Sequence, residues 1–488
     1  MTKRLMGYLG MCFILLAFPA VMFAQTPNWH SDGLIENNAG FNGFLPQVAI
    51  SGNNVVAVWY QSDGSNTRIY SNYSTDGGAT WGSDQLIENN AGFDGASPQV
   101  AISGNNVVAV WMQLDAGGNY RIFANRSSNG GVTWGSDQLI DDHPGFSAGF
   151  PQVAMSGLNV VVVWAQDDAT TFQRIYSDYS TDGGATWHAD QPLENNTGFD
   201  GWFPEVAMSG NNVVAVWYQP DATALRIYSN YSTNGGATWG SDQLIEDNAG
   251  NSGITPQVAI SGNNAVAVWV QLLGGIFRIY SNYSTNGGAT WGSDQLIEDN
   301  GAVPIGGNLP QVAISGSNAV AVWQQFDGTT TRVYSNYSTN GGATWGSDQL
   351  IEDNAGLSGG FPQVAISGLN VVAVWQQSDG SDYRIYSNHS TNGGATWGSD
   401  QLIEDNVGHA ADSPQVAMSG NNIVAVWRQS DGQDNLRIYS NYAVFEQAAQ
   451  VTAPVPTMTE WGMIILMILV GLGATYRLRR QKRTGVIG

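Results

Sequence analysis

Polar and apolar residues form short blocks along most of the chain, and the same blocks return every 52 to 54 residues. In one unit, Pro46–Ile50 is followed by a Ser-Gly-Asn-Asn turn and then by Val55–Trp59, a continuous apolar run suited to burial on both faces of a sheet. A variable loop, Arg68–Tyr73, an Asp-Gly-Gly turn and Trp81–Ile87 complete the unit. Helical periodicity is absent between residues 28 and 445, so the pattern predicts four short strands per unit and an all-β fold.

The number of units follows from two markers. The first strand begins at a proline in eight units, and the second strand ends at a tryptophan in eight units. A repeat of this length encodes one small sheet that cannot bury its apolar face alone, so neighbouring units stack. Four strands per unit with Gly-rich turns are typical of the blades of a β-propeller. We therefore predict an eight-bladed β-propeller of four-stranded antiparallel blades over residues 28–445.

The two ends of the repeat region predict how the ring closes. A copy of the fourth strand, Trp29–Ile35, comes before the first unit, whereas the last unit ends after its third strand at Tyr442–Phe445. We expect the N-terminal strand to complete the last blade, because this pairing removes two open sheet edges.

Charge and composition exclude some classes of binding partner, above all polyanions. Residues 28–445 contain 38 Asp and Glu, ten Arg and no Lys, a net charge of about −28 against −23 for the whole chain. Such a surface repels phosphate backbones and anionic headgroups, so we expect neither nucleic acid nor adsorption to a membrane surface. Cys12 is the one cysteine, and the five histidines are scattered, so we expect no disulfide, no zinc site and no cofactor. Acidic loops at 62–64 and 298–300 are either solvated turns or calcium ligands.

The N-terminal end has the pattern of a secretory signal peptide. Lys3 and Arg4 precede an apolar run, Met11–Val21, and Ala24 is the expected cleavage position. We therefore predict a signal peptide over residues 1–24 and use of the export machinery.

The C-terminal end predicts a membrane helix. Residues 461–476 are apolar, and a cluster of Arg and Lys follows at once. This arrangement predicts a short transmembrane helix whose basic tail stays in the cytoplasm, so that the propeller lies outside the inner membrane.

A short motif precedes this helix and consists of Val455, Pro456, Thr457, Met458, Trp461 and Gly462. It resembles the Ile-Pro-Thr-Leu-x-x-Trp-Gly C-terminal sorting signals of Gram-negative bacteria, with Val and Met in place of Ile and Leu. The resemblance implies recognition by an exosortase-type membrane protease, removal of the helix and delivery to the cell surface. Residues 455–488 are then a sorting signal and 446–454 a linker; the alternative is a plain C-terminal anchor.

An octapeptide marks seven turns between a third and a fourth strand. Its first copy, Ser74–Trp81, reads Ser-Thr-Asp-Gly-Gly-Ala-Thr-Trp. It resembles the Asp-box of bacterial sialidases and related propellers, Ser-x-Asp-x-Gly-x-Thr-Trp, and this resemblance implies a structural role away from the active face. Asp and Asn can both hydrogen-bond the backbone of a turn, so this role survives the exchange of one for the other. The box residues are Asp76, Asn129, Asp182, Asn234, Asn286, Asn340 and Asn392.

The resemblance to sialidases raises the question of catalysis. That family uses three arginines that converge on the substrate carboxylate, together with a Tyr–Glu pair and an Asp. Here one arginine recurs at the start of each third strand, and only Arg126 and Arg428 are additional within the repeats. Equivalent arginines in a ring do not gather at one centre, so we predict no catalytic residue and expect them to pair with carboxylates of the adjoining loops. They are Arg68, Arg121, Arg174, Arg226, Arg278, Arg332, Arg384 and Arg437.

The units differ mainly in the loop between the second and third strands and in the loop that leads into the next unit. In an up-and-down blade these two loops share one face of the disc, the loop face, and the other turns, with the Asp-boxes, share the box face. Variable loops on a rigid scaffold are common binding sites. We expect a surface protein that binds a glycan or protein ligand without catalysis; a sialidase-type exo-glycosidase and a structural surface-layer component are the alternatives. The candidate contacts are Trp202, Phe150, Phe203, Phe361, Tyr120, Arg126 and Arg428.

Overall fold

The computed structural model describes residues 26–446, apart from 39, 91, 170, 171, 196, 197, 249, 300–305, 355, 407 and 434, together with Leu469 and Leu472. The predicted signal peptide, nearly all of the linker and nearly all of the sorting signal lie outside the described residues. Leu469 and Leu472 are helical. Within the described part, no helix combines the length and the hydrophobicity that a membrane crossing needs. The transmembrane helix at 461–476 stays a prediction.

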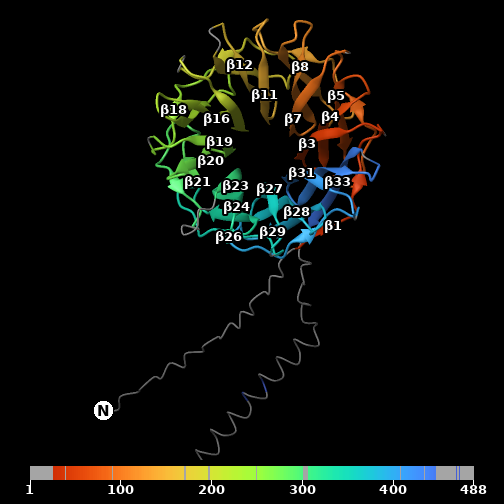
Figure 1. The fold of residues 1–488 in the computed structure, drawn as a ribbon, viewed down its shortest axis with the longest axis vertical. Coiled ribbons are helices and arrows are strands. Elements are labelled where there is room, and N and C mark those ends of the chain that lie inside the picture. Colours follow the sequence, from red (N-terminus) through yellow and green to blue (C-terminus); the bar gives the residue numbers. More distant parts are fainter. Residues whose placement is uncertain are drawn as a thin grey trace, which may run out of the picture. The chain divides into compact units, whose positions relative to one another are not determined.

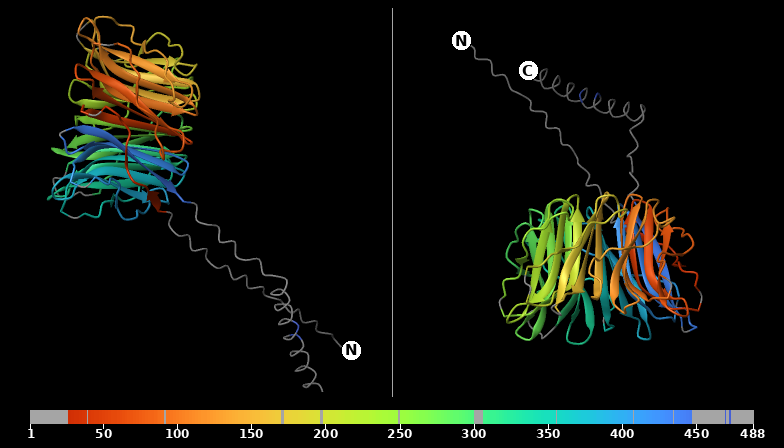
Figure 2. Two further views of the ribbon diagram at one scale, coloured as in Figure 1. Left: turned by 90° about the vertical axis from the view of Figure 1, so that its right-hand side faces the viewer. Right: turned by 90° about the horizontal axis from the view of Figure 1, so that it is seen from above.

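Eight antiparallel sheets are arranged in a ring around a central opening, with one long strand of each sheet innermost (Figure 1). Seen from the side, the ring is a disc with loops on both faces (Figure 2). The predicted all-β propeller of eight four-stranded blades is confirmed. In chain order, the strands of the first seven blades are β3 (Gly43–Ser51), β4 (Asn54–Ser62), β5 (Thr67–Ser74) and β6 (Gln85–Leu86); β7 (Gly95–Ser103), β8 (Asn106–Leu114), β9 (Tyr120–Ser127) and β10 (Gln138–Leu139); β11 (Ala148–Ser156), β12 (Asn159–Asp167), β13 (Gln173–Ser180) and β14 (Gln191–Pro192); β15 (Trp202–Ser209), β16 (Asn212–Pro220), β17 (Leu225–Ser232) and β18 (Gln243–Leu244); β19 (Gly253–Ser261), β20 (Asn264–Leu273), β21 (Ile276–Ser284) and β22 (Gln295–Leu296); β23 (Gly307–Ser315), β24 (Asn318–Phe326), β25 (Thr331–Ser338) and β26 (Gln349–Leu350); β27 (Gly359–Ser367), β28 (Asn370–Ser378), β29 (Tyr383–Ser390) and β30 (Gln401–Leu402).

The eighth blade contains both ends of the propeller. Its first three strands are β31 (Ala411–Ser419), β32 (Asn422–Ser430) and β33 (Leu436–Phe445). β2 (Gly33–Leu34) takes the place of the fourth strand beside β33, and β1 (Pro27–Trp29) pairs with the end of β33.

The N-terminal segment therefore closes the ring, as predicted, but in two pieces. A single strand over Trp29–Ile35 was wrong, because the chain leaves the β33 ladder after the His30 N–H bonds to Tyr442 O (3.2 Å). It returns to the ladder at Gly33, and the Ile35 N–H then bonds to Ile438 O (3.0 Å). Gly82 of the first blade makes the equivalent bond to Tyr73 O (2.9 Å) at the end of its Asp-box. The geometry of the closing segment thus follows that of the other blades.

The fourth strands are shorter than predicted. The expected strand over Trp81–Ile87 is reduced to β6, which spans Gln85–Leu86. Trp81 packs against the core between two blades, and both Ile87 and Glu88 are buried. Two consecutive residues that point inward break the alternation of a strand, so the ladder ends there.

The hydrophobic core lies between adjacent blades. Val55–Trp59 of β4 is completely buried, which confirms the predicted burial on both faces. Val58 belongs to a cluster with Trp111 of the following blade. Trp59 belongs to a cluster with Val424 of the preceding blade. Each second strand therefore holds two neighbours together, and the core is continuous around the ring.

A buried ion pair also joins each blade to the next. Arg68, at the start of β5, pairs through Nε with the buried carboxylate of Glu88. Gln113 of the next blade donates to that carboxylate (Nε2–Oε2 2.9 Å) and accepts from Trp111 (Nε1–Oε1 3.2 Å). The prediction that the repeated arginines pair with loop carboxylates was therefore incomplete. Loop residue Asp63 is only the second, more exposed partner of Arg68, at 3.1 Å.

Both ends of the propeller leave from the box face. The Gly77 N–H of the first Asp-box donates to Asn53 O, in the turn between β3 and β4 (2.9 Å). The Phe445 N–H makes the equivalent bond to Asn421 O in the eighth blade (3.0 Å), and Pro27 pairs with Phe445. The loop face is therefore the side of the disc away from both chain ends.

Candidate binding site at the loop face

Each innermost strand has the same irregularity near the loop face. In the first blade the register of β3 and β4 shifts between Phe44 and Gln47, and Leu45 has a φ of 45°. Bulky residues rarely adopt positive φ, and a bulge re-aims the side chain that it carries. The bulge therefore turns one side chain per blade toward the mouth of the central channel. The residues with this backbone are Leu45, Ser97, Phe150, Phe203, Thr255, Leu309, Phe361 and Ser413.

Four aromatic side chains, which we call the aromatic cluster, join the third and fourth blades at this mouth. The rings of Phe150 and Phe203 lie 4.4 Å apart between centroids. Phe203 stacks on Tyr218 at 5.8 Å, and Tyr218 meets Trp202 at 5.5 Å. Phe150 and Phe203 remain 41% and 44% exposed. The cluster is thus a firmly packed apolar surface that is open to a ligand.

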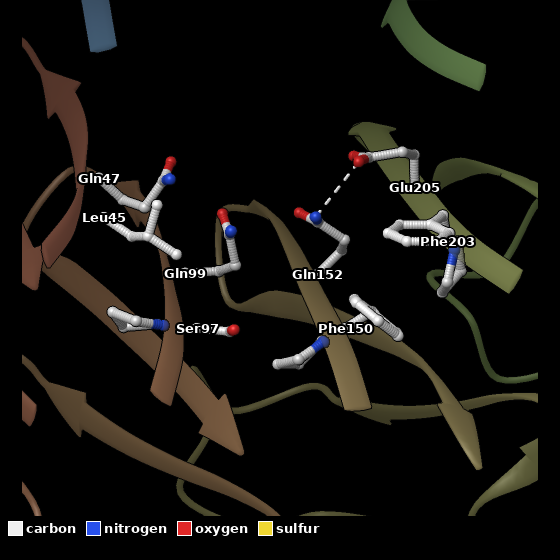
Figure 3. Close-up of a pocket in the computed structure, with 11 residues that line it drawn as sticks. Leu45, Gln47, Ser97, Gln99, Phe150, Gln152, Phe203 and Glu205 are labelled. Atoms are coloured by element: carbon white, nitrogen blue, oxygen red, sulfur yellow. Dashed lines mark hydrogen bonds between the residues drawn. The ribbon is translucent and has the colours of Figure 1, made fainter. Parts of the chain in front are cut away.

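A ring of polar side chains lies beside these bulges. Each innermost strand contributes the residue after its proline, which is Gln in seven blades and Glu in one. Figure 3 shows four of them pointing toward the central opening, next to four of the bulge residues. Together they line a pocket of about 130 Å³. The ring consists of Gln47, Gln99, Gln152, Glu205, Gln257, Gln311, Gln363 and Gln415.

Glu205 is the one member of this ring that can carry a charge. Its Oε1 accepts hydrogen bonds from Nε2 of Gln152 (3.2 Å) and of Gln257 (3.1 Å), on the two neighbouring strands. Burial raises the pKa of the Glu205 carboxyl to about 8, and the bond from Gln257 opposes that rise. No cation contacts this carboxyl in the described part of the chain, so it keeps a proton near neutral pH.

Arg428 is held in a second group, between the eighth and first blades. Its guanidinium pairs with Asp412 (2.6 Å) and lies over the ring of Phe44, 5.3 Å from the centroid. Phe44 in turn stacks on Tyr60 at 5.3 Å. Arg428 thus lies on the loop face, and a carboxylate and an aromatic ring already occupy its guanidinium.

Phe361 lines another pocket, of about 210 Å³, between the sixth and seventh blades. Tyr383 stands on its rim, 43% exposed. The Oε1 of Gln324 accepts from the Phe361 N–H (3.1 Å), and the Oε1 of Gln376 accepts from the Ser413 N–H (3.3 Å). This pocket is more polar than the one beside Glu205.

The remaining two predicted contacts lie apart from these groups. Tyr120 begins β9 at the loop face, where its N–H donates to Ser147 Oγ (3.3 Å), and it does not line either described pocket. Arg126 lies at the opposite end of β9, beside the Asp-box that begins at Ser127. Its placement among the loop-face contacts was wrong, because a strand of eight residues carries its two ends to opposite faces of the disc.

The Asp-boxes hold their turns through a repeated set of hydrogen bonds. Asp76 Oδ1 accepts from the Ser74 hydroxyl (2.7 Å) and the Thr80 N–H (2.8 Å), and Oδ2 accepts from the Thr80 hydroxyl (2.6 Å). In the second box, Asn129 Oδ1 accepts the same two bonds, and Nδ2 donates to Thr133 Oγ1 (2.9 Å). Only the direction of the last bond differs between Asp and Asn.

The acidic loops at 62–64 and 298–300 are the candidate calcium ligands. Among the described residues, no group of three or more His, Cys, Asp or Glu could hold a metal ion. In the first loop, Asp63 Oδ1 accepts from the N–H groups of Ser65 and Asn66 (2.8 and 2.9 Å), and Oδ2 pairs with Arg68. Asn300, in the second loop, lies outside the described residues. Calcium binding stays the alternative to a solvated turn.

The structure adds Glu205 and Tyr218 to the predicted contacts. Glu205 has a signal in the sequence, because Pro-Gln-Val in seven units becomes Pro-Glu-Val in one. Both residues lie within strands, whereas the units differ mainly in their loops. The bulge, which brings strand residues to the channel mouth, has no such signal.

Two family models match parts of the chain. Residues 178–189 match the BNR/Asp-box repeat, and residues 453–480 match the IPTL-CTERM motif. The second match indicates an exported protein that an exosortase-type system sorts to the cell envelope.

Solved structures are similar to this chain at low sequence identity. The polysaccharide lyase Uly1 is 11% identical, over 71% of this chain and 89% of that one, with a TM-score of 0.47. An α-L-arabinanase of Penicillium chrysogenum is 13% identical, over 61% and 94%, with a TM-score of 0.40. The endosialidase of phage phi92 is 10% identical, over 88% and 70%, with a TM-score of 0.42. Similarity at this level concerns the fold alone, and no curated protein matches the chain. The chain is thus an Asp-box repeat β-propeller with an IPTL-CTERM motif at its C-terminal end.

Proposed function

We propose that this protein is displayed at the surface of a Gram-negative cell and binds a ligand around the channel mouth of its loop face, without catalysing a reaction. The main support is asymmetric chemistry on a nearly symmetric scaffold. The aromatic cluster and Glu205 lie together in the third and fourth blades, whereas the equivalent positions of β23 are Asn308, Leu309 and Gln311. A local concentration of aromatic rings with one ionisable group is typical of a binding site.

The position of the chain ends supports display. The signal peptide at 1–24 would direct export, and the helix at 461–476 would hold the chain in the inner membrane until an exosortase-type protease removes it. Both ends of the propeller leave from the box face. A propeller attached through its C-terminal end then presents the loop face away from the attachment point.

The distribution of arginines supports binding over sialidase-type catalysis. The arginine at the start of each third strand pairs with a buried carboxylate, as Arg68 does with Glu88. Arg428 is paired with Asp412, and Arg126 lies on the box face. Within the described residues, these guanidinium groups are therefore engaged or remote, and three of them do not converge on one substrate carboxylate.

The test compares two matched variants of the full-length protein on arrays of glycans and surface proteins. Phe203→Ser alters the aromatic cluster, and Leu309→Ser alters the equivalent bulge in the sixth blade; Ser is the natural residue at that bulge in Ser97 and Ser413. Loss of a central aromatic contact should weaken binding about tenfold or more. We expect this loss for Phe203→Ser and little change for Leu309→Ser.

Three outcomes would contradict the proposal. Hydrolysis of a fluorogenic sialoside that is lost in an Arg428→Ala variant would support the exo-glycosidase. Ordered self-assembly with no ligand on either array would support the surface-layer component. Binding that neither Phe203→Ser nor Leu309→Ser weakens would place the ligand away from the aromatic cluster.

A further inference from the structure

Glu205 and its two neighbours form a group of hydrogen-bond acceptors. Gln152 and Gln257 both turn their amide nitrogens to Glu205 Oε1. Among the described residues, no side chain or backbone group donates to Glu205 Oε2 or to the amide oxygens of Gln152 and Gln257, and Glu205 and Gln152 line the open pocket. Because each amide nitrogen points to Glu205, the two amide oxygens flank the carboxyl on either side, and Glu205 Oε2 is the central acceptor of the group (Figure 3).

This acceptor group suits an ammonium ion. An ammonium presents three N–H donors and no acceptor, so it can donate to Glu205 without leaving an acceptor of its own unpaired, and its positive charge favours the carboxylate. The charge also matches, because residues 28–445 carry about −28 and no lysine of their own. A field of this sign raises the local concentration of cationic partners.

The size of the pocket limits what can reach the acceptors. Its volume of about 130 Å³ is below the roughly 300–1,000 Å³ of sites that enclose a whole small molecule. The exposed rings of Phe150 and Phe203 form its apolar wall. A slender aliphatic chain that ends in an ammonium fits this combination, because its methylene groups pack on the rings and its head reaches Glu205.

We infer that the channel mouth binds a lysine side chain of a protein partner, with the ammonium at Glu205 and the aliphatic stem on Phe150 and Phe203. This inference rests on the proposed function, since it names the ligand class of the same site.

Binding of this kind is linked to a proton. The free Glu205 carboxyl is largely neutral at pH 7, because burial raises its pKa to about 8. The strands packed against β15 carry three other charged residues, Asp167, Arg174 and Asp178, but the Glu205 pKa responds only to burial and to Gln257. A bound ammonium favours the carboxylate, so binding releases the proton. Affinity should therefore rise about tenfold per pH unit below 8 and level off above it.

The experiment is calorimetric titration of the full-length protein with a capped Gly-Gly-Lys-Gly-Gly peptide, in two buffers of different ionisation heat at pH 7. We expect binding with release of about one proton, and no binding of the same peptide with acetyl-lysine. Glu205→Gln installs the residue of the other seven blades, so it should fold normally, bind at least tenfold more weakly at pH 8 and release no proton. The variant Glu205→Gln/Gln311→Glu restores the net charge in the sixth blade and should stay as weak as Glu205→Gln.

Two results would overturn the inference. If Glu205→Gln binds the peptide as tightly as the native protein, the carboxyl does not contact the ammonium. If the double variant regains the native affinity, Glu205 acts only through the net charge of the propeller. Preference for a glucosamine oligomer over the lysine peptide would overturn the ligand class. An array ligand that depends on Phe203 but not on Glu205 would leave the proposed function standing and remove only this inference.

Discussion

Asp178 occupies a buried position that is asparagine in the other blades. In the first blade, Asn72 Nδ2 donates to Ile35 O (2.8 Å) and Gly82 O (2.9 Å), and so ties two segments to β5. A carboxylate cannot donate these bonds. Asp178 Oδ1 accepts from the His188 N–H (3.0 Å), whereas Oδ2 has no partner among the described residues. Burial raises the pKa of Asp178 to about 7, against the hydrogen bonds from Tyr179 and His188.

We expect Asp178→Asn to stabilise the protein at neutral and alkaline pH. The folded-state pKa is above the unfolded value of about 3.9, so the native residue favours folding only at low pH, and this contribution is lost as the pH rises from about 4 through 7. Restoring the donor should raise the unfolding free energy by about 1–3 kcal/mol at pH 8 and by much less at pH 4. Thermal unfolding at both pH values measures this difference.

The reciprocal variant is the control. Asn72→Asp should make the unfolding free energy depend on pH in the same way through the first blade, with a lower value at pH 8. If the stability difference between Asp178→Asn and the native protein is the same at pH 4 and pH 8, the raised pKa of Asp178 is not the source of the effect.

Each Asp-box holds one turn, and its contribution can be tested at the scale of that element. Asp76 links Ser74 and Thr80 through three hydrogen bonds. Asp76→Ala removes all three and leaves the Thr80 N–H without its acceptor, so it should cost about 1–3 kcal/mol of unfolding free energy. Asp76→Asn should change stability by less than about 0.5 kcal/mol, because Asn129 makes the equivalent bonds. Chemical unfolding of the two variants measures both values.

Equal losses in the two Asp76 variants would show that charge, and not the hydrogen-bond pattern, holds the turn. Asn129→Asp in the second box is the matched control, and it should also be close to neutral.

The accuracy of the sequence predictions differed between elements for physical reasons. The second strands were predictable because burial on both faces leaves an uninterrupted apolar run, as in Val55–Trp59. The fourth strands were predicted to be too long because Ile87 and Glu88 both turn inward. A charged residue is tolerated at the buried position of Glu88 because it pairs with Arg68. A buried ion pair looks like two solvated residues in a sequence.

The candidate site was predictable in part for a related reason. Phe150 and Phe203 were found from their variation at the ends of loops. Glu205 was missed because strand residues were expected to face a core, whereas the innermost strands face an open channel. Which strand of a blade is innermost depends on the closed ring, and a single unit does not specify it.

At the scale of the whole molecule, the ring is held closed at one junction by short pairings. β1 and β2 contribute three and two residue pairs with β33, and no covalent turn joins them to it. Trp29 and Ile35 add buried contacts in the clusters of the eighth blade. In the other blades the fourth strand follows the third directly in the chain. Separation of this junction is therefore the expected first step of unfolding, because no covalent turn keeps the closing segment beside β33.

A disulfide across this junction should raise the stability of the whole propeller. Asn28 and Val444 are direct partners in the antiparallel pair, at a separation that suits a disulfide. The variant Asn28→Cys/Val444→Cys closes a loop that includes nearly the entire propeller, so the oxidised form should gain about 3–5 kcal/mol over its own reduced form. Thermal unfolding with and without reductant measures the gain, and the variants with only one of the two substitutions, which leave the closing pair without a bridge, should not respond to reductant. If the oxidised and reduced forms of the double variant unfold at the same temperature, unfolding begins elsewhere in the ring, and the short closing strands are not its weakest junction.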